Sequence, residues 1–144
     1  MQSMGLDQGK RGLNNLAENI RRVCNTDDKT VNLEAYQTGF KTGWSIFCSP
    51  INGFKMGKKG DLYKSFCPED KEDLFREKFL IGKKVNEKND QLSEYEDKIK
   101  ELSQGGEKDL SAREELTRTE ESLRSLKREI QALEQKGMSL VHTN

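Results

Sequence analysis

The sequence predicts an all-α protein, with a small glycine-rich, disulfide-stapled helical head followed by a long antiparallel helical hairpin, a coiled coil. Nine of the ten aromatic residues, all three cysteines and eight of the twelve glycines lie at or before residue 80. Apolar residues recur at helical spacing in both parts, and two heptad series follow each other out of phase in the second part. We therefore divide the chain into a head at residues 1–67, a hairpin at 68–137 and a flexible tail at 138–144.

The first predicted helix begins with a glycine ladder. The segment GLDQGKRG places Gly5, Gly9 and Gly12 at positions i, i+4 and i+7, on one helical stripe. Aliphatic residues continue this stripe at Leu16, Ile20 and Val23. The pattern predicts one helix over residues 4–23, frayed at its start.

The second predicted helix follows a polar segment, and Asn32 is well placed to cap it. Its apolar stripe consists of four aromatic residues, Tyr36, Phe40, Trp44 and Phe47. Gly39 and Gly43 lie beside this stripe and add a further i, i+4 glycine pair. We interpret the aromatic residues as core, with a binding surface as the alternative.

A second ladder, GFKMGKKG, places Gly53, Gly57 and Gly60 at the same spacing as the first. A turn-forming cluster at residues 48–53 precedes it, and we predict a short helix over 53–65 rather than a loop. Each interior glycine costs a helix about 1 kcal/mol relative to alanine. The glycines of both ladders and of the second helix are therefore expected to allow close packing between helices.

The alternative role of the second ladder is ligand binding. A small ligand would press against the bare backbone of the three glycines, flanked by the cationic side chains of Lys55, Lys58, Lys59 and Lys64. The segment is not a P-loop, because three residues rather than four separate its first two glycines and no Ser or Thr follows the lysines.

The hairpin is predicted to begin at Pro68, which suits a first helical position and precedes four carboxylates that favour a helix N-terminus. The first heptad series ends at the glycine pair 105–106, which is expected to terminate the helix. The second series begins with a capping box formed by Ser111 and Glu114 and is expected to end at Gly137.

The phase of the two heptad series favours a fold-back. Ile99 and Leu123 are 24 residues apart rather than a multiple of seven, so an uninterrupted rod would misalign its apolar seam. Antiparallel pairing around residue 109 instead places apolar residues opposite one another. The pairs are Leu102 with Leu116, Tyr95 with Leu123, Leu92 with Leu126, and Val85 with Leu133. A parallel dimer with a hinge at the glycines is the alternative.

The three cysteines, Cys24, Cys48 and Cys67, have no C-x-x-C spacing, and the only histidine, His142, lies in the tail. A zinc site in the head would lack a ligand, so we expect no metal. In an oxidising compartment we expect one disulfide with one cysteine left over, and we favour Cys48 with Cys67 because both flank the short helix. Nucleophilic catalysis by Cys67 is not expected, because four nearby acids disfavour a thiolate and no histidine can act as its base.

The overall charge narrows the classes of partner. The net charge is zero, and basic and acidic residues are interspersed in both parts, so we expect no nucleic-acid partner. No apolar run reaches the length of a membrane span. The segment MQSMGLDQGK lacks the features of a signal peptide. Either the mature protein is cytosolic, or the sequence begins after a removed targeting segment.

The segments GLDQGKRG and EAYQTGFKTGWSIFCSPINGFKMGKKGDLYKSFCPED combine many fixed spacings over roughly residues 5–82. They resemble the bacterial family known as domain of unknown function 2799, whose pattern continues into a coiled-coil tail. The matching positions are Gly5, Gly9, Gly12, Ala35, Tyr36, Gly39, Gly43, Cys48, Asn52, Gly53, Phe54, Gly57, Gly60, Tyr63, Cys67 and Pro68. This sequence departs from the family at Gln8, where an acid is usual, at Trp44 for Leu, at Phe47 for Tyr and at Ser49 for Thr.

The resemblance implies a bacterial envelope protein, often a lipoprotein whose signal peptide and lipidated cysteine lie upstream, and it supports cysteines that form disulfides. It implies no activity and no cofactor. We therefore expect a noncatalytic periplasmic or outer-membrane structural or interaction module, whose coiled coil engages a protein partner or a second copy. A head that binds a small ligand or cell-wall fragment is the alternative, and an enzyme is the weakest.

Overall fold

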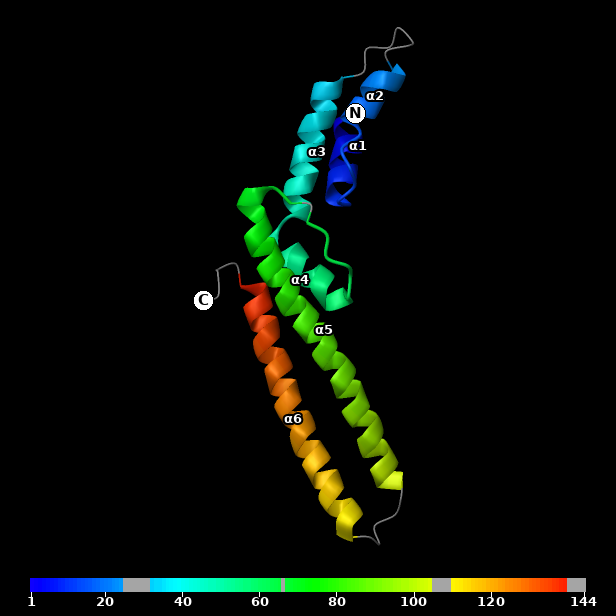
Figure 1. Cartoon of the computed structure of the whole chain (residues 1–144), viewed down its shortest axis with the longest axis vertical. Helices are drawn as coiled ribbons and strands as arrows, with labels where there is room; N and C mark the ends of the chain where they lie inside the picture. Colours follow the sequence, from blue (N-terminus) through cyan, green and yellow to red (C-terminus); the bar gives the residue numbers. More distant parts are fainter. Residues whose placement is uncertain (25–31, 66, 105–109, 140–144) are drawn as a thin grey trace. The chain divides into compact units, whose positions relative to one another are not determined.

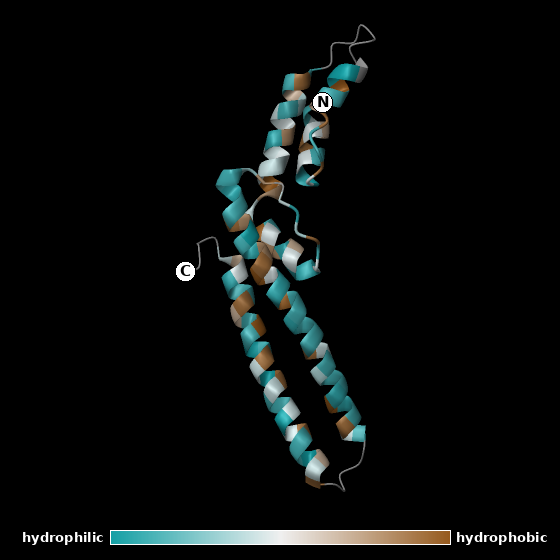
Figure 2. Ribbon diagram, viewed as in Figure 1, coloured by the Kyte–Doolittle hydropathy of each residue, from teal (hydrophilic) through white to brown (hydrophobic). Residues whose placement is uncertain are grey.

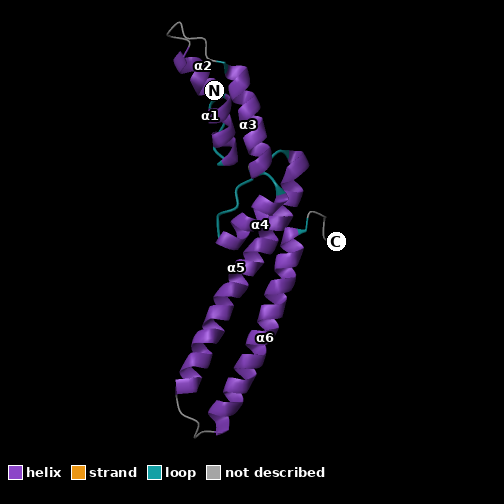
Figure 3. Cartoon of the chain, turned by 180° about the vertical axis from the view of Figure 1, so that it is seen from behind, coloured by secondary structure: helices purple, strands orange, loops and turns teal. Residues whose placement is uncertain are grey.

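The computed structural model describes residues 1–24, 32–65, 67–104 and 110–139. These residues form helices and connecting loops, and Figure 3 shows no strand among them. The helices are α1 (Gln2–Lys10), α2 (Ala17–Cys24), α3 (Leu33–Phe47), α4 (Pro50–Lys59), α5 (Glu69–Gln104) and α6 (Leu110–Met138), labelled in Figure 1. The all-α prediction is confirmed.

The chain folds into two compact units. The head unit comprises Met1–Gly53 and Lys64–Glu77, and the hairpin unit comprises Phe54–Tyr63 and Lys78–Asn144. This division differs from the boundary expected at residue 67, because α4 and α5 each contribute residues to both units. Each unit is therefore assembled from two separate segments of the chain.

The helix expected over residues 4–23 is two helices, so that prediction is wrong. Gly12 follows α1 with a φ of 64°, its N–H donates to the Gly9 carbonyl at 3.0 Å, and the N–H of Leu13 donates to Gln8 at 3.1 Å. This pair of bonds is a Schellman motif, in which a left-handed glycine ends the helix. A glycine stop cannot be told from a packing glycine by its spacing alone.

The second helix is capped as predicted. The Asn32 side chain accepts a hydrogen bond from the Ala35 N–H at 2.8 Å, at the start of α3. The turn expected at residues 48–53 is shorter than predicted, because α4 already begins at Pro50. The Ser49 hydroxyl accepts from the Asn52 N–H at 3.3 Å, and proline suits the first helical position after such a cap.

The end of α4 repeats the ending of α1. Gly60 has a φ of 78°, its N–H donates to the Gly57 carbonyl at 3.0 Å, and the N–H of Asp61 donates to Met56 at 3.1 Å. The short helix therefore ends at Lys59, not at residue 65 as expected. The third glycine of each ladder stops its helix, and only the first two lie within it.

Within the hairpin unit, the residues of α5 from Lys78 onward and α6 run antiparallel (Figure 1). The core cluster consists of Phe54, Ile81, Val85, Leu126 and Ile130, with Leu92 and Leu133 packed against it. Ion pairs cross between the helices from Lys88 to Glu129, from Lys98 to Glu115 and from Lys127 to Glu96. Figure 2 shows apolar residues recurring along both arms among polar ones. The predicted hairpin is confirmed.

The first and last residues of α6 differ from the start and end predicted from the sequence. Within the described residues α6 begins at Leu110, so Ser111 lies inside its first turn and not directly before it. The glycine pair at 105–106 lies outside the described residues. Gly137 does not end the helix, which continues to Met138. An ideal Cβ on Gly137 would lie 2.2 Å from the Phe54 ring, so this glycine makes room for an aromatic side chain.

Candidate functional site

In the head unit, the glycines of α1 and α3 lie against each other's backbone. An ideal Cβ on Gly5 would be 2.1 Å from the Tyr36 carbonyl oxygen, and one on Gly43 would be 2.2 Å from the Leu6 oxygen. An ideal Cβ on Gly9 would be 2.4 Å from the Phe40 carbonyl oxygen, and one on Gly39 would be 2.0 Å from the Gln2 carbonyl oxygen. Figures 1 and 3 show the two helices side by side. No larger residue fits at these four positions without moving a helix.

Tyr36 connects this helix pair to the segment before α2. Its ring is fully buried. Its hydroxyl donates to the Gln8 side-chain oxygen at 2.6 Å and accepts from the Leu16 N–H at 3.0 Å. Gln8 accepts this hydrogen bond through its amide oxygen, as a carboxylate at this position also could. Trp44 is half-buried, and its ring meets Phe40 edge to face at 5.2 Å.

The second ladder lies against α5. In the head unit, an ideal Cβ on Gly53 would be 2.5 Å from the Phe75 oxygen. In the hairpin unit, one on Gly57 would be 2.0 Å from the Phe79 oxygen, and one on Gly82 would be 2.2 Å from the Phe54 oxygen. Gly82 was not singled out from the sequence, although its helical phase could have revealed a reciprocal glycine.

This packing places α5 over part of the ladder that the ligand-binding alternative would use. The Cα atoms of Gly53 and Gly57 face backbone atoms of α5. Gly60 is exposed and ends the helix. The cations Lys55, Lys58 and Lys59 are also exposed, and Lys58 forms an ion pair with Glu134 on α6.

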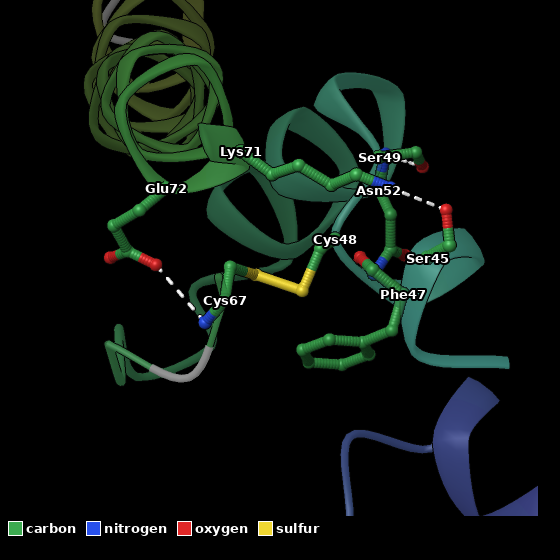
Figure 4. The surroundings of a disulfide bond; sticks show 8 residues. All are labelled: Ser45, Phe47, Cys48, Ser49, Asn52, Cys67, Lys71 and Glu72. Carbon is green, nitrogen blue, oxygen red and sulfur yellow. Dashed lines mark hydrogen bonds between the residues drawn. A yellow bond between two sulfur atoms is a disulfide. The ribbon is translucent and has the colours of Figure 1, made fainter. Parts of the chain in front are cut away.

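The predicted disulfide joins Cys48 to Cys67, with their Cα atoms 5.6 Å apart. Figure 4 shows its surroundings, where Lys71 donates to the Ser45 hydroxyl and the Glu72 carboxylate accepts from the Cys67 N–H at 3.1 Å. The bridge closes a loop with a sequence separation of 19, which stabilises the folded chain by about 3 kcal/mol in the chain-entropy model. The side chain of Cys24, the third candidate, lies outside the described part of the structure.

Lys78 is a buried cation that sequence reasoning missed. Its side chain is inaccessible to solvent, and its Nζ donates to the backbone oxygen of Lys136 at 3.2 Å, in the last turn of α6. A cation at this position satisfies an orphan carbonyl and complements the negative end of the helix dipole. The only available signal was its helical spacing to Ile81 and Val85 in the sequence.

The outer part of the hairpin carries an open polar hollow of about 430 Å³ lined by Tyr95, Lys98, Glu115 and neighbouring α6 residues. The pKa of Lys98 is raised above its usual 10.5, chiefly because its ammonium group hydrogen-bonds to Glu115. Within the described residues, no cluster of three or more His, Cys, Asp or Glu side chains could hold a metal ion. None of the described helices is both long and apolar enough to span a membrane.

Comparison with known protein families identifies the family of this chain. Residues 2–84, more than half of the chain, match the profile of a family described as "Protein of unknown function (DUF2799)". The chain belongs to this family. The DUF2799 match contains the paired glycines of α1, α3 and α4, the disulfide and Gly82, whereas α6 lies beyond it. Neither the curated proteins nor the solved structures contain a significant match to this chain.

Proposed function

We propose that this chain is a noncatalytic structural or protein-interaction module of the bacterial cell envelope. The head unit is the scaffold, and the outer half of the hairpin is the contact surface. Association with a membrane would come only from a lipidated residue upstream.

The observation that carries this proposal is that the apolar side chains between α5 and α6 are well buried near α4 but less buried farther along the hairpin. Near α4, Phe54 packs onto the seam, and Val85, Leu126 and Ile130 are buried there. Farther along the two arms the apolar seam residues are only half-buried or exposed, although Thr119 between them is buried. These apolar residues are Leu92, Tyr95, Ile99, Leu102, Leu116 and Leu123. A row of partly exposed apolar side chains is suited to packing against another helical protein.

The proposed compartment is supported by the disulfide. Disulfides persist in oxidising environments such as the periplasm and are rare in the reducing cytosol. In the reducing cytosol the bridge between Cys48 and Cys67 would contribute nothing to stability, because the chain-entropy effect requires the covalent bond.

Site-specific photo-crosslinking in intact bacteria tests the interaction role. A photoreactive amino acid at Leu123, on the half-buried seam, should give a discrete protein adduct. The same amino acid at Lys41, on an exposed face of the head unit, is the control and should not give that adduct. If the Leu123 position forms no adduct with any protein, including a second copy, the interaction role is refuted. Thiol labelling of periplasmic extracts before and after reduction tests the compartment separately.

A further inference from the structure

The charges of the hairpin unit are segregated along its length. We define the base as residues 54–63, 78–88 and 126–138, and the tip as 89–104 and 110–125. The base carries ten basic and four acidic residues, a net charge of +6, whereas the tip carries five basic and nine acidic residues, a net charge of −4. The zero net charge of the whole chain conceals this asymmetry.

The segregated charges are not neutralised by the hairpin itself. Within the described residues, five exposed lysines of the base and five exposed carboxylates of the tip form no ion pair. The lysines are Lys55, Lys59, Lys83, Lys84 and Lys136, and the carboxylates are Asp90, Glu94, Asp97, Glu101 and Glu121. A hairpin with a basic base and an acidic tip is well suited to a partner that places acidic residues against the base and basic residues against the tip.

The apolar seam follows the same division. At the base, α4 supplies a third helix, and Phe54 completes the core with Ile81 and Val85. At the tip, only α5 and α6 are present, and their apolar seam residues are half-buried or exposed. The tip therefore lacks a third layer where it is acidic, and the outer face of α4 at the base displays Lys55 and Lys59.

We propose that the hairpin binds a second copy of this chain in antiparallel orientation, so that the acidic tip of each copy packs on the basic base of the other. The charge changes sign near residues 89 and 125, about midway along the arms, and a two-fold axis there would bring base and tip into register. A parallel pair would instead place like charges together, which is destabilising. This proposal rests on the interaction role above and names its partner.

An anionic lipid surface is the competing occupant of the base. It would attract the basic residues within about a Debye length. A membrane, however, would leave the acidic charge and the half-buried seam of the tip without a partner. The second copy satisfies both ends with one symmetric contact.

The test measures the molar mass of the full chain by light scattering. At low salt the wild type should have about twice the monomer mass of 16.5 kDa. In roughly 1 M salt, where the Debye length falls to about 3 Å, it should shift toward the monomer. A monomeric wild type at low salt overturns the proposal, whereas an adduct of Leu123 with a different protein would still leave the interaction role standing.

Charge reversal tests the complementarity. A base-reversed variant carries Lys55→Glu, Lys59→Glu, Lys83→Glu and Lys84→Glu, and a tip-reversed variant carries Asp90→Lys, Glu94→Lys, Asp97→Lys and Glu101→Lys. Each variant alone should be monomeric, whereas their equimolar mixture should regain the doubled mass. Circular dichroism verifies that both are helical. A control with four equivalent reversals in the head unit, Lys10→Glu, Arg22→Glu, Lys41→Glu and Arg76→Glu, should remain dimeric.

Spin labels decide the orientation in a Cys24→Ser background. Labels at the tip position Ser103 should lie roughly 36 Å apart in the antiparallel dimer, because this site is 12 residues from Gln91 at the centre and a helix rises about 1.5 Å per residue. Labels at Gln91 should lie much closer. Short distances at both positions would show a parallel pair and refute the proposal. Binding of a monomeric wild type to anionic vesicles, lost in the base-reversed variant, would assign the base to lipid instead.

Discussion

Replacing Gly57 with alanine has two opposing effects on stability, a gain in helix propensity and a steric clash with α5. Alanine favours a helix by about 1 kcal/mol over glycine, so propensity alone predicts a more stable protein. The structure places the new methyl group 2.0 Å from the Phe79 oxygen and 2.8 Å from the Lys83 nitrogen. Both are backbone atoms of α5, which cannot move as a side chain would.

The magnitude follows from the overlap. Non-bonded carbon contacts are normally about 3.5 Å or longer, so α4 and α5 would have to separate locally by roughly 1.5 Å. Overpacking by one methyl group costs up to about 3 kcal/mol, occasionally more. After subtracting the helix-propensity gain, we expect Gly57→Ala to lower the free energy of unfolding by about 2 kcal/mol, and Gly57→Val to lower it further.

Urea unfolding of the oxidised protein, followed by circular dichroism, measures this change. Lys55→Ala is the matched control, because Lys55 lies on the same helix and is exposed, and its replacement should change stability by no more than about 0.5 kcal/mol. An unchanged or increased stability of Gly57→Ala would refute the close contact between the two backbones. It would also favour the ligand-binding alternative for the ladder.

Three further changes test other contacts. Tyr36→Phe should destabilise the head unit by about 1–2 kcal/mol, because the N–H of Leu16 and a side-chain oxygen lose their hydroxyl partner; thermal melting measures this. Reduction, or joint replacement of Cys48 and Cys67 by serine, should lower the free energy of unfolding by about 3 kcal/mol, as measured in urea. Glu115→Gln should lower the raised pKa of Lys98 in an NMR titration, because the residue that raises it is neutralised. A raised cation pKa stabilises the fold below pH 10.5, and this contribution is lost as the pH rises through the folded-state pKa. An unchanged Lys98 pKa in Glu115→Gln would contradict the pairing.

Local signals and long periodic patterns predicted much of this fold. The Asn32 cap depends only on the residues that follow it, and the hairpin depends on heptads that extend over many turns. The phase difference between the two series was enough to predict a fold-back. The ion pair between Lys88 and Glu129 lies close to the predicted register.

The errors arose where a distant contact decides the role of a residue. Gly12 and Gly137 are both glycines on helical stripes, yet the first stops a helix and the second admits the Phe54 ring. The sequence does not indicate the contact between Lys78 and Lys136, because the acceptor is a backbone oxygen far along the chain. Backbone contacts of this kind leave no side-chain signature.

The bridge between Cys48 and Cys67 also makes the intervening segment a closed covalent ring that contains the whole of α4. Leu62 and Lys64, on the loop within this ring, are exposed, which makes the loop accessible to a protease. A single cut there would break the backbone without separating the polypeptide into two molecules. The two fragments would come apart only after reduction, so a nicked chain would still migrate as one species on a non-reducing gel.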